Sequence, residues 1–361
     1  MTLLELFSGC GGAALGLARA GWEHLACIER DDAAAETLAA AGLPVLHADV
    51  RDVHYRPFAG RTDLLWASPP CQAGSTAGKR RGVNDDRNGW PWTLDVIDTV
   101  KPTWFLAENV LGWTYHRKGC DRRGHDLTCT GCYWSGWLFP QLRQRFPFVG
   151  SWVMNAADYG TPQHRRRVIL WAGPLPLSQS PPAPSHADTD VRTLGPGEQP
   201  WVSMAESVGD TLNRQSCDWR RCYPCDGTHG RACTESDRIA RPSPALTASE
   251  SRGTRANAKA GWSFNGGPDR ASDAAFLIAG IRRVSLDEAL TLQGFPPDWP
   301  MRGGIGDQYR QLGNAVPPQL SEAAGRAIAI AEQVRRRLEH HDLPAMTRAL
   351  HASGQTLPVS V

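Results

Sequence analysis

The sequence predicts an α/β fold built on a doubly wound parallel sheet, with a second, loop-rich domain inserted into it. Short apolar runs typical of buried strands alternate with helical segments from the N-terminus onwards. A glycine-rich turn joins the first run to the first helix. A long stretch rich in Pro, Cys, Arg and Gly then interrupts this pattern, which resumes near the C-terminus.

The N-terminal elements follow one another with short connections. We expect strands over Leu3–Phe7, Glu23–Ile28 and Val45–Leu46, and helices over Ala13–Ala20 and around Ala34, Leu38 and Ala41. Four later strands are expected over Leu64–Ala67, Trp104–Ala107, Trp152–Asn155 and Arg167–Ala172. Because ligands of doubly wound sheets bind outside the carboxyl ends of the strands, the polar residues that follow these runs are candidates for a site.

The change of amino-acid composition at Gly173 predicts the domain organisation. Residues 1–172 form the first part of one domain, residues 173–280 a separate loop-rich domain, and residues 281–342 the return to the first domain. Helices are expected over Ser285–Leu292 and Gln319–Leu338, and the second should pack on the first domain. Residues 343–361 read as a weakly ordered tail.

The composition is that of a globular chain of roughly two domains. Of its 361 residues, 41% are hydrophobic and 21% charged, which excludes a disordered protein or a fibre. A net charge of +2 excludes bulk polycationic attraction to nucleic acid. Only four of the 39 basic residues are lysines, and the arginines that make up the rest suit contacts with phosphate and guanine. A GC-rich genome is the simpler explanation for this excess of arginine.

The termini and cysteines bear on the compartment. No apolar run is long enough for a membrane helix, and the N-terminus has no basic segment typical of an export signal. We therefore expect a soluble, cytoplasmic protein without membrane partners. In a reducing compartment the ten cysteines remain thiols, so they are structural, metal-binding or catalytic.

The glycine turn after the first strand indicates a nucleotide-like cofactor. Gly9, Gly11 and Gly12 let the backbone approach a ligand, while Glu29 at the end of the second strand can bind a ribose. Asp49 after the third strand adds to the pattern. Close packing of the helix on the strand is the simpler explanation for the glycines.

A cysteine follows the fourth expected strand. Pro69 and Pro70 stiffen the turn that presents Cys71. The small, basic, glycine-containing segment 73–82 follows and is suited to closing over a polyanion. A lone cysteine is usually inert core, but this setting favours a reactive thiol.

Six motifs occur in an order typical of one enzyme family. They are Leu6–Gly12 (LFSGCGG), Pro70–Gln72 (PCQ), Glu108–Val110 (ENV), Gln163–Arg167 (QHRRR), Gln293–Pro296 (QGFP) and Gly313–Pro317 (GNAVP). Together they resemble the DNA cytosine-5 methyltransferases over about Leu3–Ala331, with Ser8 in place of the commoner alanine. The variable middle corresponds to that family's target-recognition domain. The resemblance implies a Rossmann-like S-adenosylmethionine-dependent methyltransferase domain.

The resemblance also implies a covalent mechanism. Since C5 of cytosine is a poor nucleophile, a thiolate from Cys71 adds to C6 and turns the ring into an enamine. Glu108 would bind N3 and the exocyclic amine, which needs a raised carboxyl pKa. Arg165 would lower the pKa of the thiol and hold the cytosine O2, and Arg167 would brace the site. A phosphate-facing arginine run is the alternative.

S-adenosylmethionine would be the methyl donor. By resemblance Glu29 takes the ribose, Asp49 the adenine amine, and Asn314 lies near the methionine end. Arg30 and Val50 could sandwich the adenine. The full set of expected cofactor-binding residues is Phe7, Gly9, Gly11, Glu29, Arg30, Asp49, Val50, Pro70 and Asn314.

Double-stranded DNA is the expected substrate, with the target cytosine flipped out of the helix. Expected DNA contacts are Gln72, Ser75, Lys79, Arg80, Arg252 and Arg255. The family resemblance favours a bacterial or phage modification enzyme, which we expect to be monomeric, and a restriction endonuclease of the same site is an expected partner. The alternatives are methylation of an exocyclic amine, which also uses a Ser-Pro-Pro motif, an RNA cytosine-5 methyltransferase, and a catalytically silent zinc-containing DNA-binding protein.

Two C-x-x-C knuckles indicate zinc, which the family does not generally carry. We expect two structural sites, one from Cys120, His125, Cys129 and Cys132 and one from Cys217, Cys222, Cys225 and Cys233. A single shared site and unliganded loop cysteines are the alternatives.

Overall fold

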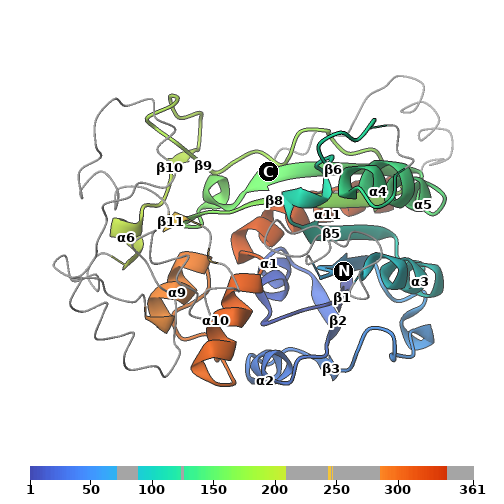
Figure 1. Cartoon of the computed structure of the whole chain (residues 1–361), viewed down its shortest axis with the longest axis horizontal. Helices are drawn as coiled ribbons and strands as arrows, with labels where there is room; N and C mark the ends of the chain where they lie inside the picture. Colours follow the sequence, from blue (N-terminus) through green and yellow to red (C-terminus); the bar gives the residue numbers. More distant parts are fainter. Residues whose placement is uncertain (71–87, 123–125, 209–242, 245, 247–284, 340–361) are drawn as a thin grey trace.

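The computed structural model describes residues 1–70, 88–122, 126–208, 243–244, 246 and 285–339. Its centre is a seven-stranded sheet in the order β3-β2-β1-β4-β5-β8-β6 (Figure 1). The strands are β1 (Thr2–Leu6), β2 (Glu23–Glu29), β3 (Val45–His47), β4 (Leu64–Ala67), β5 (Trp104–Asn109), β6 (Phe148–Asn155) and β8 (Arg166–Gly173). All seven predicted strands are confirmed, with ends that differ by a few residues.

The sheet is mixed, so the prediction of a wholly parallel sheet was wrong for one strand. β3, β2, β1, β4 and β5 pair in parallel, whereas β8 runs antiparallel to both β5 and β6. Only residues 156–165 join β6 to β8, and they hold the 3-10 turn η6 (Ala156–Tyr159) and the short strand β7 (Gln163–His164). A parallel crossover needs a dozen residues or more, so this connection forces an antiparallel pair.

Helices cover both faces of the sheet (Figure 1). They include α1 (Gly12–Arg19), α2 (Asp32–Ala40), α3 (Trp90–Val100) and α11 (Pro318–Leu338). Alternate residues of β1 point to opposite faces: Leu4 packs in a cluster with Ile97 of α3, and Leu3 in a cluster with Leu17 of α1 and Leu320 of α11. The predicted helices that correspond to α1, α2 and α11 are confirmed, and α11 packs on the first domain as expected, whereas α3 was not predicted.

Several helices were not predicted. α4 (Thr130–Tyr133), the π-helical turn η5 (Trp134–Leu138) and α5 (Phe139–Arg143) pack beside α3, and α10 (Ile305–Asn314) precedes α11. The short elements η1 (Arg56–Phe58) and η4 (Leu111–Trp113) were also not predicted. The predicted helix near residue 285 is α9 (Leu286–Gln293), which Ser285 begins with a capping box to Glu288.

The inserted segment is described only in part. It contributes β9 (His186–Ala187), β10 (Gln199–Pro200), α6 (Met204–Val208) and β11 (Ser243–Pro244), which pairs with β7. Met204 and Val208 pack in a cluster with Leu290 of α9. The predicted domain boundaries therefore stay predictions, and the tail 343–361 lies outside the described residues. Within the described part of the chain, no helix has the length and apolar content to span a membrane.

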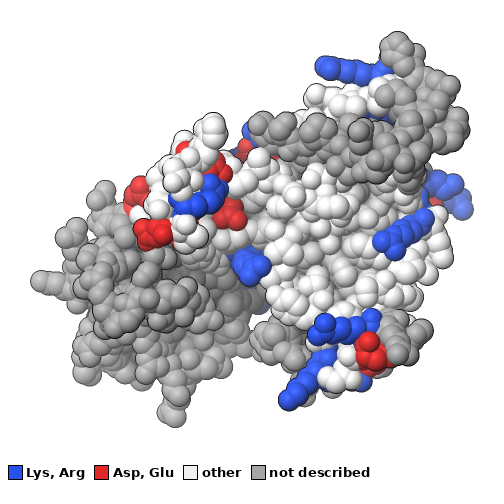
Figure 2. All heavy atoms as spheres, turned by 90° about the horizontal axis from the view of Figure 1, so that it is seen from above, with Lys and Arg blue, Asp and Glu red and all other residues white. Residues whose placement is uncertain are grey.

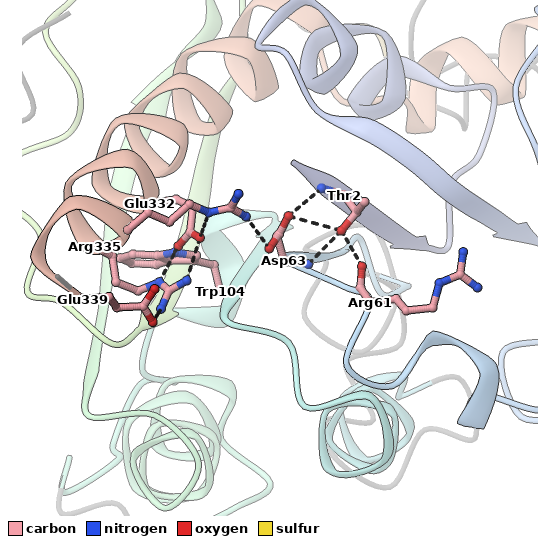
Figure 3. Close-up of polar contacts among 8 residues, drawn as sticks. Thr2, Arg61, Asp63, Trp104, Glu332, Arg335 and Glu339 are labelled. Carbon is pink, nitrogen blue, oxygen red and sulfur yellow. Dashed lines mark hydrogen bonds and ion pairs between the residues drawn. The ribbon is translucent and has the colours of Figure 1, made fainter.

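A polar network fixes α11 to the ends of the strands opposite the predicted site (Figure 3). The buried Glu332 accepts a hydrogen bond of 2.8 Å from Trp104 Nε1 and ion pairs from Arg335 and Arg336. Arg336 also reaches Asp63, whose carboxylate accepts a bond from the amide of Thr2. Burial alone would raise the pKa of Glu332, but the bonds from Arg335, Arg336 and Trp104 lower it, so the carboxylate stays charged.

Two glycines of α1 allow α11 to approach closely. A Cβ on Gly16 would lie 2.0 Å from the carbonyl oxygen of Pro318 and 2.1 Å from Ser321 Oγ, and one on Gly12 would lie 2.1 Å from the carbonyl oxygen of Val316. These contacts are too short for any side chain. The glycines therefore bring α11, and with it the preceding residues, back against the glycine turn.

Replacing Gly16 with alanine is expected to lower the free energy of unfolding by about 1–3 kcal/mol, since the added methyl group overpacks this interface. Gly306→Ala is the matched control, because a Cβ on that glycine of α10 meets nothing within 4 Å. Urea unfolding of both variants measures the difference. Equal stabilities would contradict the packing argument.

Candidate active site

A cavity of about 300 Å³ lies at the carboxyl ends of β1, β2, β3, β4 and β5, where the sequence predicted a ligand site. Residues that follow each of these strands line it, and α10 contributes its last residues. The antiparallel direction of β8 brings the start of that strand, rather than its end, to the same edge. Arg165 and Arg167 consequently enter the cavity lining.

The glycine turn forms one wall of the cavity with a strained backbone. Phe7 and Gly9 have φ values of 58° and 55°, in the left-handed region that favours glycine. For phenylalanine this conformation is uncommon and costs energy, which points to a functional constraint. The Gly9 amide donates a 2.7 Å hydrogen bond to Glu29 Oε2 at the end of β2.

Two carboxylates are fixed beside this turn. Glu29 also accepts hydrogen bonds from the amides of Arg30 and Asp31, at 2.9 and 2.8 Å. Asp49 accepts bonds from Arg51 and an ion pair of 3.1 Å from Arg30, and the hydrogen bond from the Arg51 side chain is the main reason that its pKa lies well below the usual range. Both side chains therefore offer oriented acceptors to a ligand.

The structure brings eight of the nine predicted cofactor-binding residues to the cavity. They are Phe7, Gly9, Glu29, Arg30, Asp49, Val50, Pro70 and Asn314. Gly11 is not among the lining residues: its φ is 90°, and an added Cβ would lie 3.0 Å from Leu38 of α2. Acceptors for hydroxyl and amine groups next to apolar Ile28 and Val50 fit the chemistry of S-adenosylmethionine.

Glu108 and Arg167 face one another at the other end of the lining. Glu108 Oε1 and Arg167 Nε form an ion pair of 2.8 Å, and both side chains are largely buried. Burial raises the pKa of Glu108, while Arg167 and Arg165 act in the opposite sense, and the net shift is upward. This direction is the one that a proton-donating carboxyl group needs.

Arg165 is 2% exposed and held by backbone carbonyls. Its guanidinium donates bonds of 2.6 Å to Leu246 and 2.8 Å to Gly313, the residue before Asn314. Gln163 donates to Gln293, which donates in turn to the carbonyl of Ala315. These contacts join three of the motifs recognised in the sequence into one framework around the cavity.

The turn that precedes the predicted nucleophile is also fixed. Asn109 Nδ2 donates a 3.0 Å bond to the carbonyl of Pro69, which ties the end of β5 to the end of β4. Pro69 and Pro70 line the cavity. Cys71 itself lies outside the described residues.

Several other lining residues were not predicted, among them Trp92, Arg310 and Asp31. Trp92 in the first turn of α3 carries the Arg51 guanidinium 4.8 Å from its ring centroid, and Arg310 of α10 forms an ion pair of 3.0 Å with Asp31. Asp31 also caps α2. The sequence offered two signals for these residues: Arg310 lies on the polar face of a helix that was not predicted, and Asp31 precedes an alanine-rich run. Neither signal is specific for a ligand site.

The predicted metal ligands separate into two groups. Cys120, Cys129 and Cys132 come together, and His116, which was not predicted, completes their cluster. His125 and the second predicted set, Cys217, Cys222, Cys225 and Cys233, lie outside the described residues.

The predicted DNA contacts Gln72, Ser75, Lys79, Arg80, Arg252 and Arg255 all lie outside the described residues. On the face in Figure 2, the described surface is mainly uncharged, with scattered basic residues and a small acidic group. This face therefore offers no continuous basic stripe among the described residues.

Comparisons with known proteins identify the family. Residues 1–174 and 211–329 match the family model described as C-5 cytosine-specific DNA methylase. The chain is 29% identical to the Type II methyltransferase M.NgoMIV of Neisseria gonorrhoeae, over 91% of this chain and 96% of the relative. It is 28% identical to M.NaeI of Lentzea aerocolonigenes, over 98% of this chain and 82% of the relative.

Solved structures share the fold. A Spodoptera frugiperda DNMT2 mutant superposes with a TM-score of 0.56 and 18% identity, over 90% of this chain and 98% of that one. A putative DNA modification methyltransferase encoded within an Escherichia coli prophage gives 0.52 and 19%, over 91% and 98%. Since the family model covers most of the sequence, the chain belongs to the C-5 cytosine-specific DNA methylase family.

Proposed function

We propose that this DNA cytosine-5 methyltransferase acts on one cytosine of a short sequence in double-stranded DNA, through a covalent bond between Cys71 and C6 of a flipped-out base. The observation that carries the proposal is the placement of Glu108, Arg165 and Arg167 in one cavity with the turn that precedes Cys71. The exocyclic-amine alternative has no use for this buried carboxyl group and its arginines.

The residues divide the work as follows. The Cys71 thiolate adds to C6, and Glu108 donates a proton to N3, so that the electron pair of the ring becomes available at C5. Arg167 orients Glu108 through their ion pair, and Arg165 supplies positive charge beside the base. When bound, S-adenosylmethionine supplies the methyl group from its positively charged sulfonium sulfur. Transfer of the C5 proton to a base then re-forms the C5–C6 double bond and expels the Cys71 thiolate, and N3 returns its proton to the Glu108 carboxylate.

Glu29 should contribute to cofactor affinity. Replacing Glu29 with alanine removes both a hydroxyl acceptor and the bond that fixes the Gly9 amide, and we expect S-adenosylmethionine to bind about 10- to 100-fold more weakly. Isothermal titration calorimetry measures the change. Glu36→Ala on the exposed side of α2 is the matched control, and equal affinities for the two variants would contradict the assignment.

The relatives named as Type II methyltransferases support a role in restriction and modification. We propose that residues 173–280 recognise the target sequence and that the DNA is contacted by Gln72, Ser75, Lys79, Arg80, Arg252 and Arg255. We also propose that the enzyme is a bacterial, cytoplasmic monomer. A restriction endonuclease of the same specificity would be its partner.

Incubation of unmethylated plasmid with the protein and S-adenosylmethionine, followed by sequencing that detects 5-methylcytosine, tests the proposal. Methylation of one short motif is expected. If the plasmid stays unmethylated while transfer RNA is methylated under the same conditions, the substrate is RNA rather than DNA.

A further inference from the structure

Four metal-binding side chains meet in a segment that no step of the methyl transfer uses. His116 follows η4, Cys120 lies in the next turn, Cys129 caps α4, and Cys132 lies within α4. None of them lines the cofactor cavity. We propose that these four residues bind a structural Zn²⁺ ion, which stabilises an aromatic layer behind the Pro69–Pro70 turn.

The distances fit one tetrahedral ion. His116 Nδ1 lies 3.6, 3.8 and 3.4 Å from the sulfurs of Cys120, Cys129 and Cys132. With zinc–sulfur bonds of about 2.3 Å and zinc–nitrogen bonds of about 2.0 Å, a tetrahedron places nitrogen and sulfur about 3.5 Å apart. All four ligand atoms lie within 4.8 Å of one another, so a single ion reaches each of them after small side-chain adjustments.

The local backbone is shaped around this cluster. The Arg117 amide donates to Cys129 Sγ and the Arg122 amide to Cys120 Sγ, each at 3.3 Å. Such bonds stabilise thiolates, the form in which cysteine binds metal. A Cβ on Gly131, between the two cysteines of the knuckle, would lie 2.8 Å from the His116 amide nitrogen. Only glycine there lets the histidine reach the sulfurs.

The surrounding segment has few buried side chains of its own. Cys129 and Cys132 are almost fully buried, yet no described residue from 114 to 128 is buried. A metal ion supplies stability where an apolar core is missing. The Sγ atoms of Cys120 and Cys132 lie 3.1 Å apart, well beyond a covalent bond of about 2.0 Å, and three sulfurs with one imidazole in tetrahedral arrangement favour zinc.

The cluster is joined to the active site by packed aromatic rings. Tyr133, next to Cys132, accepts a 3.1 Å bond from Asn88 Nδ2, and its ring contacts Trp113, three residues before His116. Trp113 and Trp134 both pack edge-on against Trp90, with centroids 6.1 and 5.7 Å apart.

This aromatic layer supports the residues behind the nucleophile turn. Gly89, between Asn88 and Trp90, approaches the turn so closely that an added Cβ would lie 2.8 Å from Pro69 Cβ and 3.0 Å from Phe7 Cζ. Zinc therefore anchors the layer on which the start of α3 and the Pro69–Pro70 turn rest. Zinc binding itself does not depend on the proposed function, whereas its effect on activity does.

Zinc content is the primary test. His116→Ala is expected to carry one zinc ion per chain fewer than the wild type by elemental analysis, while the matched variant His125→Ala keeps the wild-type content. Measuring the difference separates this site from any zinc held by Cys217, Cys222, Cys225 and Cys233. Wild-type zinc content in His116→Ala, or loss of the ion from His125→Ala alone, overturns the ligand set.

Alkylation of the wild-type protein keeps the test independent of variant folding. Cys120 is partly exposed, so as a free thiol it reacts with iodoacetamide, whereas zinc protects it until 1,10-phenanthroline removes the metal. Mass spectrometry of the labelled peptides measures both rates. Rapid labelling of Cys120 before chelation overturns the proposal, and so does a Cys120–Cys132 disulfide.

Discussion

Replacing Cys71 with serine is expected to lower methyl transfer by at least about 10⁴-fold, a loss of the size seen when a nucleophile is removed from an enzyme that depends on it. A serine hydroxyl is a far weaker nucleophile than a thiolate and does not ionise near neutral pH. Binding of S-adenosylmethionine and DNA should change little, because the Glu29, Asp49 and Glu108 side chains remain.

DNA that contains 5-fluorocytosine at the target position makes the adduct visible. After addition of Cys71 to C6 and methylation at C5, elimination requires the group at C5 to leave as a cation, which fluorine does not do. The wild type should therefore stay covalently bound to the DNA on a denaturing gel, and Cys71→Ser should not. A covalent complex with the serine variant, or unchanged turnover, would disprove the thiol mechanism; unchanged thermal unfolding is the control for folding.

Much of the fold could be predicted because the sequence repeats one simple pattern. Buried runs such as Leu64–Ala67 are apolar on both faces of the sheet, as a parallel sheet covered by helices requires. The direction of β8 could not be predicted in the same way, because its apolar run is compatible with either direction. The short connection after β6 decides it, and that connection becomes recognisable only when the strand pairing is known.

The candidate site, too, could be predicted only where the local sequence pattern determines the position of a residue. Glu29 and Asp49 follow predicted strands, so the fold class alone places them together. His116 joins the cysteines because the chain turns at Gly119, whose φ is 82°, and because Gly131 lies close to the His116 backbone. Nothing in the spacing of the sequence favoured it over His125. Arg310 was missed because α10 has few apolar residues and was not predicted as a helix.

Replacing Glu108 with glutamine should lower kcat by about 10²- to 10⁴-fold, the usual contribution of a general acid. Glutamine keeps the size of the side chain and can still bind the base, but it has no acidic proton for N3. Glu36→Gln on the exposed side of α2 is the matched control and should retain full activity. Equal kcat values for the two variants would show that Glu108 only binds the base.

The pH profile separates proton donation from binding. Because burial raises the pKa of Glu108, the carboxyl group keeps its proton to a higher pH than an exposed glutamate, and kcat/KM should fall as the pH rises through that value. Titration of the Cys71 thiol acts in the opposite sense, since the thiolate forms as the pH rises. Glu108→Gln should therefore lose the alkaline decline and keep the acidic one.

Replacing Arg167 gives a second test of the alkaline decline of kcat/KM. Its ion pair with Glu108 lowers the carboxyl pKa, in opposition to burial. Arg167→Gln should consequently raise the pKa of Glu108 further and move the alkaline decline of kcat/KM to higher pH. Rates measured from about pH 5 to 10 test this order. An alkaline decline that stays in place in both variants would mean that a group other than Glu108 holds the proton that reaches N3.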